Sequence, residues 1–234
     1  KISHPNIVAV LGYSHDAGKG AIYIVMELVV GTDLSKLLED RRKTAAAPPA
    51  PATGGVLGWE DFLQVCTGIA AGLAHLQSRC TIHRDLKPAN VMIDAASRPG
   101  FLVAKITDFG LSKRMAAPLM ATTTTCGTIN YMSPEAMTKG RIGPVTDVYG
   151  LGIMMWEMLT GETARAGLDM MGAVTAIATG VKPSPLPPSV QPGAVVSRLP
   201  REGSRATHSS RGRAPAPAAD SAIGYSHSAI LILF

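Results

Sequence analysis

The sequence predicts an α+β fold in which a mostly helical larger part follows a small β-rich remnant. Two apolar runs, at about residues 8–13 and 21–26, are rich in β-branched residues and are separated by turn-forming residues 16–20. From Trp59 onward apolar residues recur three or four positions apart, and residues 145–160 are strongly apolar. A strand-rich stretch followed by longer helical stretches is compatible with an α+β fold.

Length and composition allow a sizeable core in one or two domains. The chain has 234 residues, of which 46% are hydrophobic and 5% aromatic, and a formal net charge of +5. The stretch from Gln191 onward supplies five arginines against two acidic residues. A nucleic-acid-binding function would depend on these scattered arginines alone, so we expect no nucleic-acid partner.

Cysteine usage favours a reducing, cytoplasmic location. The three cysteines have no paired metal-ligand spacing, and no run reaches the roughly 18 apolar residues of a membrane span. The first residue is Lys1 and not Met, so we expect a fragment of a longer parent. The first residues do not have the pattern of a signal peptide. Membrane attachment through preceding segments stays open.

One short stretch carries a phosphoryl-transfer chemistry. It reads Ile82-His83-Arg84-Asp85-Leu86-Lys87-Pro88-Ala89-Asn90. Asp85 can accept the proton of an attacking hydroxyl, Lys87 can neutralise phosphate charge, and Asn90 offers a hard oxygen to Mg²⁺. Each residue alone would be read as an ordinary surface group. Their combination predicts catalysis.

Ordered motifs downstream strengthen this prediction. Asp108-Phe109-Gly110 begins eighteen residues after Asn90, Ser133-Pro134-Glu135 follows, and Asp147 opens an apolar segment. In this order the motifs resemble those of eukaryotic protein kinases of the Ser/Thr or tyrosine-kinase-like branch. The resemblance implies a protein-kinase-like fold with an incomplete catalytic domain: a large, mostly helical C-lobe and a truncated N-lobe.

The resemblance also divides the chain. Residues 1–30 would be the N-lobe remnant and hinge, and residues 31–188 the C-lobe, with a flexible Ala/Pro/Gly-rich insertion at 43–58. Residues 189–234 form a divergent tail that we expect to be disordered. The family's glycine-rich loop, strand lysine and helix glutamate would precede Lys1, so the chain as written is expected to be feeble or inactive.

A nucleotide site with ATP and Mg²⁺ is implied by the same resemblance. The metal ligands would be Asn90 and Asp108, and the catalytic pair Asp85 and Lys87. A Met beside a strand is also a common core residue. The expected nucleotide-binding residues are Met26 at the back of the pocket, Glu27, Leu28 and Val29 in the hinge, Asp33 at the ribose and Met92 below the adenine.

Other residues would support or regulate the site. Asp147 would cap the backbone around His83 and Arg84, although an N-cap role is also open. Val10, His83 and Phe109 would stack in an internal apolar column. Gly110 would let the Asp108 backbone move, and Glu135 would lack the arginine that the family pairs with it.

The segment 111–132 resembles an activation segment. Phosphate on one of four threonines could pair with Arg84 and order the segment, although a plain polar loop is equally compatible. Thr128, together with Lys87, fits the Ser/Thr pattern. The candidate phosphosites are Thr122, Thr123, Thr124 and Thr125.

The sequence therefore favours a kinase that transfers the γ-phosphate of ATP to Ser/Thr hydroxyls of protein substrates. The alternative is a catalytically inactive, pseudokinase-like scaffold that acts by binding partners. The acidic and amide residues of the motif favour the kinase for the parent protein, whereas the truncation favours the scaffold for this chain.

Overall fold

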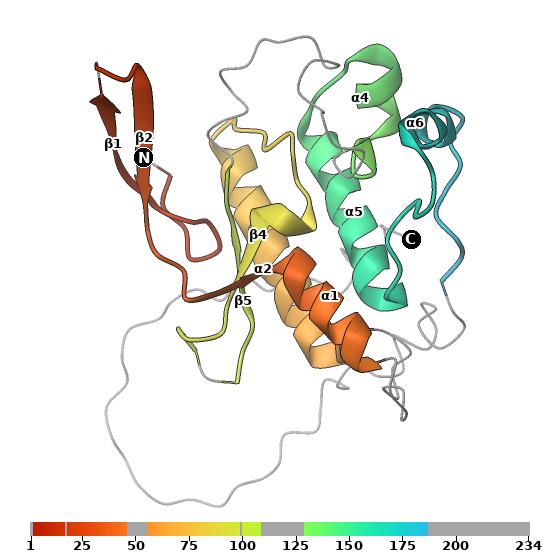
Figure 1. Ribbon diagram of the computed structural model, residues 1–234, viewed down its shortest axis with the longest axis horizontal. Helices are drawn as coiled ribbons and strands as arrows, with labels where there is room; N and C mark the ends of the chain where they lie inside the picture. The colour runs from red at the N-terminus through yellow and green to blue at the C-terminus, as the bar shows by residue number, and fades with distance from the viewer. Residues whose placement is uncertain (1, 17, 46–55, 99, 109–128, 187–234) are drawn as a thin grey trace, which may run out of the picture.

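A computed structural model describes residues 2–16, 18–45, 56–98, 100–108 and 129–186 (Figure 1). Helices and two small antiparallel sheets confirm the predicted α+β class. In order, the elements are β1 (Val10–Asp16), β2 (Ala21–Met26), β3 (Gly31–Asp33), α1 (Leu34–Ala45), α2 (Trp59–Ser78), the 3₁₀ turn η1 (Pro88–Asn90), β4 (Val91–Asp94), β5 (Val103–Ile106), α4 (Pro134–Lys139), α5 (Pro144–Thr160) and α6 (Met170–Ala178).

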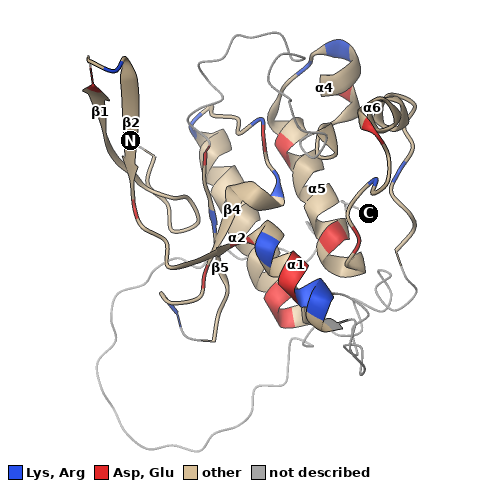
Figure 2. Cartoon of the chain, in the orientation of Figure 1, with Lys and Arg blue, Asp and Glu red and all other residues tan. Residues whose placement is uncertain are grey.

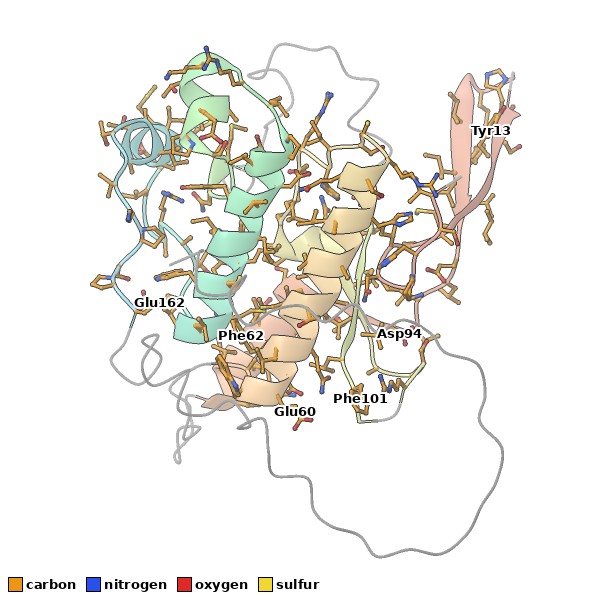
Figure 3. All side chains as sticks on the ribbon, turned by 180° about the vertical axis from the view of Figure 1, so that it is seen from behind. Tyr13, Glu60, Phe62, Asp94, Phe101 and Glu162 are labelled. Carbon is orange, nitrogen blue, oxygen red and sulfur yellow. The ribbon has the colours of Figure 1, made fainter. Side chains whose placement is uncertain are left out.

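β1 and β2 form a hairpin that stands to one side of the helices (Figure 1). The Asp16 carboxylate closes the turn by accepting the N–H groups of Gly18 at 3.0 Å and Lys19 at 3.2 Å. Figure 3 shows Tyr13 at the far end of this hairpin, remote from Phe62 in the core. Val10 is 37% exposed, so its predicted place in an internal column is wrong. The chain enters the core earlier, at Ile7.

The second sheet has the order β3-β4-β5 and carries the larger part of the molecule. Ile7 forms a parallel bridge with Ile106 of β5, and the Val8 N–H donates to the Ile106 carbonyl at 2.8 Å. The segment before the hairpin is thus attached to the large sheet. Ile7, which lies in the stretch predicted as an N-lobe remnant, therefore belongs to the main core.

Close approach of two strands requires glycine at position 31. A Cβ built on Gly31 would lie 1.9 Å from the carbonyl oxygen of Ile93 on β4. We expect Gly31→Ala to push β3 away from β4 and to lower the free energy of unfolding by about 1–3 kcal/mol, as overpacking does. Urea unfolding measures this loss. Gly12→Ala is the matched control, because a Cβ there meets nothing within 4 Å; equal losses in both variants would contradict the steric explanation.

The core lies where α2 packs against β5 and α5 (Figure 1). The side chains at helical spacing along α2 are all buried, as the sequence periodicity predicted. Leu34 and Leu38 of α1 and Met154 and Met158 of α5 complete the same cluster. The buried apolar positions of α2 are Phe62, Val65, Cys66, Ile69, Leu73 and Leu76.

The boundaries predicted for the 43–58 insertion are wrong at both ends. α1 continues to Ala45, and Lys43 pairs with Glu39 one turn earlier at 2.7 Å. Val56 and Leu57, which precede the N-cap Gly58 of α2, are buried in the main core. Residues 46–55 lie outside the described part, as do residues 187–234, which include the tail predicted at 189–234.

The strands predicted at about 8–13 and 21–26 lie at Val10–Asp16 and Ala21–Met26, and the apolar segment 145–160 falls within α5. The sequence missed the short helix α4, whose N-cap Ser133 accepts the Ala136 N–H at 3.4 Å. Among the helices of the described residues, none has the length and apolar character needed to cross a membrane.

Candidate active site

Asp147 holds the loop that carries the motif residues. It lies in the first turn of α5 and is 1% exposed. Its Oδ2 accepts the His83 N–H at 2.8 Å and its Oδ1 the Arg84 N–H at 2.9 Å. The N-cap of α5 is Gly143, so Asp147 is not the N-cap. Arg84 has φ 74°, a conformation that costs on the order of 1–3 kcal/mol and that this clamp helps to maintain.

His83 ties this loop to the strand end before Asp108. The His83 ring is fully buried, and its Nδ1 accepts the Asp85 N–H at 3.3 Å. The accepting Nδ1 carries no proton, so in the neutral ring Nε2 is the donor to the Thr107 carbonyl, 2.8 Å away. The Thr107 N–H donates in turn to the Asn90 carbonyl at 3.0 Å. These bonds bring the Asp85 loop and the Asp108 segment together.

The Asp85 carboxylate is held by two donors from its own loop. Its Oδ2 lies 2.8 Å from Lys87 Nζ and 3.1 Å from Asn90 Nδ2. The same amide nitrogen of Asn90 donates to the Asp85 carbonyl at 2.7 Å. The Asp85 side chain remains 38% exposed, so a hydroxyl group can reach it. The structure thus gathers an acid, a cation and an amide at one place.

Asn90 and Asp108 suit a Mg²⁺ ion. Asn90 is buried beside Asp85, whereas Asp108 is exposed and has φ 62°. Amide and carboxylate oxygens are ligands that Mg²⁺ prefers, and it usually takes only one or two protein ligands besides water and phosphate. Within the described ranges no three His, Cys, Asp or Glu side chains gather into a closed metal cage, and such a site does not require one.

The residues predicted to form the hinge directly follow β2. The Glu27 N–H donates to the Ala9 carbonyl at 2.9 Å and is therefore not available to a nucleotide. Its side-chain Oε1 accepts the Ala9 N–H at 3.0 Å and Lys105 Nζ at 2.9 Å. Leu28 is 89% exposed, and Met26 is also exposed.

Asp33 and Met92 are brought together by the sheet. They are direct partners in the β3-β4 pairing. Asp33 Oδ1 accepts the Lys36 N–H at 2.9 Å, which makes Asp33 the N-cap of α1, a role that the sequence prediction did not assign to it. The remaining predicted positions, Phe109, Gly110, Thr122, Thr123, Thr124, Thr125 and Thr128, lie outside the described residues.

Comparison with known proteins decides the family. The model of the protein kinase domain matches residues 1–182, most of the chain. The chain belongs to the protein kinase family. Among its relatives are the serine/threonine-protein kinase PknA of Mycobacterium tuberculosis, 34% identical over 197 residues, and the mitogen-activated protein kinase kinase kinase dlk-1 of Caenorhabditis elegans, 32% identical over 199 residues.

The matched regions cover most of this kinase chain but a minority of each relative. They span 82% of the chain and 41% of PknA, and 83% of the chain and 19% of dlk-1. An Arabidopsis thaliana protein named as a leucine-rich repeat receptor-like serine/threonine-protein kinase is 30% identical over 167 residues, which are 69% of this chain and 17% of that protein.

The kinase chain also contains a buried polar cluster that sequence reasoning missed. Tyr131 Oη donates to Glu157 Oε2 at 2.9 Å, and Glu157 Oε1 accepts the Ala164 N–H at 2.8 Å. Burial raises the pKa of Glu157 and that of Tyr131. A glutamate inside the apolar α5 was the available signal. The cluster ties residues 129–132 to α5. Glu135, which follows this stretch in the sequence, is half-buried in the first turn of α4.

The ion pair between Glu27 and Lys105 should make the free energy of unfolding depend on pH. Burial would raise the pKa of Glu27, but hydrogen bonds from Lys105 and the Ala9 N–H outweigh it, and the pKa lies below the usual 4.5. The pair therefore stabilises the fold above the unfolded-state pKa, and this contribution is lost as pH falls through the lower folded-state pKa. Glu27→Gln should be less stable than the parent at pH 6, with a difference that shrinks towards pH 3.

Urea unfolding at a series of pH values measures this difference. Glu39→Gln is the control, because Glu39 pairs with Lys43 at the exposed surface of α1. Its smaller effect should disappear at high salt. A Glu27→Gln difference that is constant from pH 6 to pH 3 would exclude the ion pair as its cause.

Proposed function

We propose that this protein transfers the γ-phosphate of ATP to serine and threonine hydroxyls of protein substrates. The observation that carries the proposal is the Asp85 carboxylate, held at Oδ2 by Lys87 and Asn90 in a loop whose backbone is clamped by Asp147. Asp85 orients the substrate hydroxyl and accepts its proton as the hydroxyl oxygen forms its bond to the γ-phosphorus, while the bond from that phosphorus to the β,γ-bridging oxygen breaks and ADP leaves. Lys87, beside it, balances the negative charge of the phosphate being transferred.

Nucleotide binding involves the two sheets and the segment between them. Asn90 and Asp108 would hold Mg²⁺, which when bound neutralises charge on the phosphates. Met26 and Met92 would pack on the adenine, Leu28 and Val29 would offer backbone groups to its edge, and Asp33 would face the ribose. This placement is supported by the sheet pairing of Asp33 with Met92 and by the position of residues 27–30 directly before β3.

Preference for Ser/Thr is supported by Lys87 in the catalytic loop and by the names of PknA and the plant relative. A cytoplasmic location is supported by the unpaired state of Cys66 and Cys80, the cysteines of the described residues. Peptides that differ only in carrying Ser, Thr or Tyr at the acceptor position test the preference directly.

Asp108→Asn tests the metal-dependent part of the proposal. We expect the affinity for ATP in millimolar Mg²⁺ to fall by at least about tenfold, because a charged ligand is lost, while affinity in EDTA stays unchanged. Titration calorimetry of the full chain gives both values. Asp40→Asn, an exposed change on α1, is the control. Equal Mg²⁺ dependence in Asp108→Asn and the parent would refute the assignment.

A phosphate-incorporation assay on the unmodified chain distinguishes a kinase from a scaffold. Incorporation of radiolabelled phosphate from ATP into a Ser/Thr peptide supports the kinase. Tight ATP binding with no incorporation into Ser, Thr or Tyr peptides would instead identify the pseudokinase-like scaffold.

A further inference from the structure

An apolar groove lies along α5, and its lining includes none of Asp85, Lys87, Asn90 and Asp108. Its volume is about 660 Å³, within the range of about 300–1,000 Å³ typical of ligand pockets. The buried side chains of Ile153, Trp156 and Ile177 are among its lining, and Val145 and Val181, which are 67% and 57% exposed, also line it. Exposed apolar surfaces of this kind commonly mark sites where another segment or protein binds.

The segment that follows α6 forms one wall of this groove. Trp156 Nε1 donates to the Ser184 carbonyl at 2.8 Å, which fixes residues 180–186 against α5. Leu186, the last described residue, is itself part of the lining. The chain therefore continues directly from the groove.

A polar or charged occupant would find few charged partners in this groove. α6 has no charged residue along its length, as Figure 2 shows, and the charged residues of the lining are Glu135 and Lys182. A matching occupant is a short uncharged apolar segment. The sequence contains one after the groove, namely Ala229-Ile230-Leu231-Ile232-Leu233-Phe234.

We propose that residues 229–234 dock in this groove of the same chain. They are joined to Leu186 through residues 187–228, which are rich in Ser, Pro, Arg and Ala. For a chain of this length the random-coil value of the root-mean-square span is about 35 Å, enough to return to a groove that begins at its own attachment point. Tethering at this distance gives an effective concentration on the order of millimolar, which favours the chain's own segment over a second copy at micromolar concentration.

Photocrosslinking of the full chain tests the docking. Phe234 is replaced by p-benzoylphenylalanine, the protein is irradiated at micromolar concentration, and crosslinked peptides are mapped by mass spectrometry. We expect crosslinks within one chain to residues 145–156 or 180–186. The double variant Val145→Asp, Val181→Asp should reduce their yield by at least about tenfold, because a charge would be buried against the apolar segment.

Met171→Asp is the matched control. Met171 is exposed, lies in the first turn of α6 as Val145 does in α5, and does not line the groove. The crosslink yield of the Met171→Asp variant should equal that of the parent. All three valine or methionine positions are exposed, so the folded state should survive, which circular dichroism and thermal unfolding verify.

Trp156 supplies an independent measurement. In a Trp59→Phe background, deletion of residues 229–234 should make the fluorescence of Trp156 more accessible to acrylamide. Unchanged quenching would overturn the proposal. So would crosslinks to the hairpin at 10–30, crosslinks between copies that vanish on dilution, or equal yields in the groove variant and the parent. None of these readouts depends on phosphoryl transfer.

Discussion

Replacement of Asp85 by Asn is expected to lower the rate of phosphoryl transfer by about 10²–10⁴-fold, the usual contribution of a positioned general base. The amide keeps the size of the side chain but cannot take up the hydroxyl proton. Lys87 and Asn90 would also face an amide in place of the carboxylate that they now contact at 2.8 and 3.1 Å. The turnover number of the full chain, measured with radiolabelled ATP and a Ser/Thr peptide, gives the loss.

Affinity for ATP separates catalysis from folding in this experiment. Asp85→Asn should bind Mg²⁺-ATP as the parent does, since Asp85 is not one of the proposed metal ligands. Asp40→Asn, on the exposed face of α1, should retain full turnover. Turnover above a tenth of the parent value in Asp85→Asn would contradict the general-base role.

Asp147→Ala is expected to cause the largest loss of stability. The two N–H groups of His83 and Arg84 lose charged acceptors at 2.8 and 2.9 Å. An unsatisfied buried donor costs about 1–3 kcal/mol, so the free energy of unfolding should fall by about 3–5 kcal/mol. This is a large part of the 5–15 kcal/mol typical of a domain. Urea unfolding monitored by circular dichroism measures it.

Two variants calibrate that result. Asp147→Asn keeps one side-chain acceptor and should lose about half as much. Asp169→Ala removes an exposed N-cap, whose Oδ1 accepts the Gly172 N–H at 2.7 Å, and should cost about 1 kcal/mol. If Asp147→Ala costs no more than Asp169→Ala, the clamp contributes little to the fold.

The sequence predicted the elements that have strong local signals. The apolar repeat along α2, the β-branched runs of the hairpin and the apolar α5 each follow from side-chain period and from β-branched content within one segment. The order of the motif residues from Asp85 to Asp108 was also readable, because it is a property of chain order alone.

Contacts between distant segments were not readable in this way. Glu27 and Lys105 are 78 positions apart, and Tyr131 and Glu157 are 26 apart. No local pattern pairs them. Exposure is equally hard to read from a local pattern. Val10 is an apolar residue in a strand pattern, and that pattern gave no indication that this face of the hairpin would be exposed.

The sequence by itself therefore determined the fold class, most of the long helices and strands, and the family, and it predicted which residues bear phosphoryl-transfer chemistry. Only the tertiary structure decided that the Asp147 carboxylate holds the loop backbone, that His83 joins the loop to Thr107, and that Asp33 faces Met92 across two strands. The physical reason is that side-chain period and residue chemistry are local, whereas a buried hydrogen bond exists only after packing has brought its donor and acceptor together and excluded the water that would otherwise satisfy both.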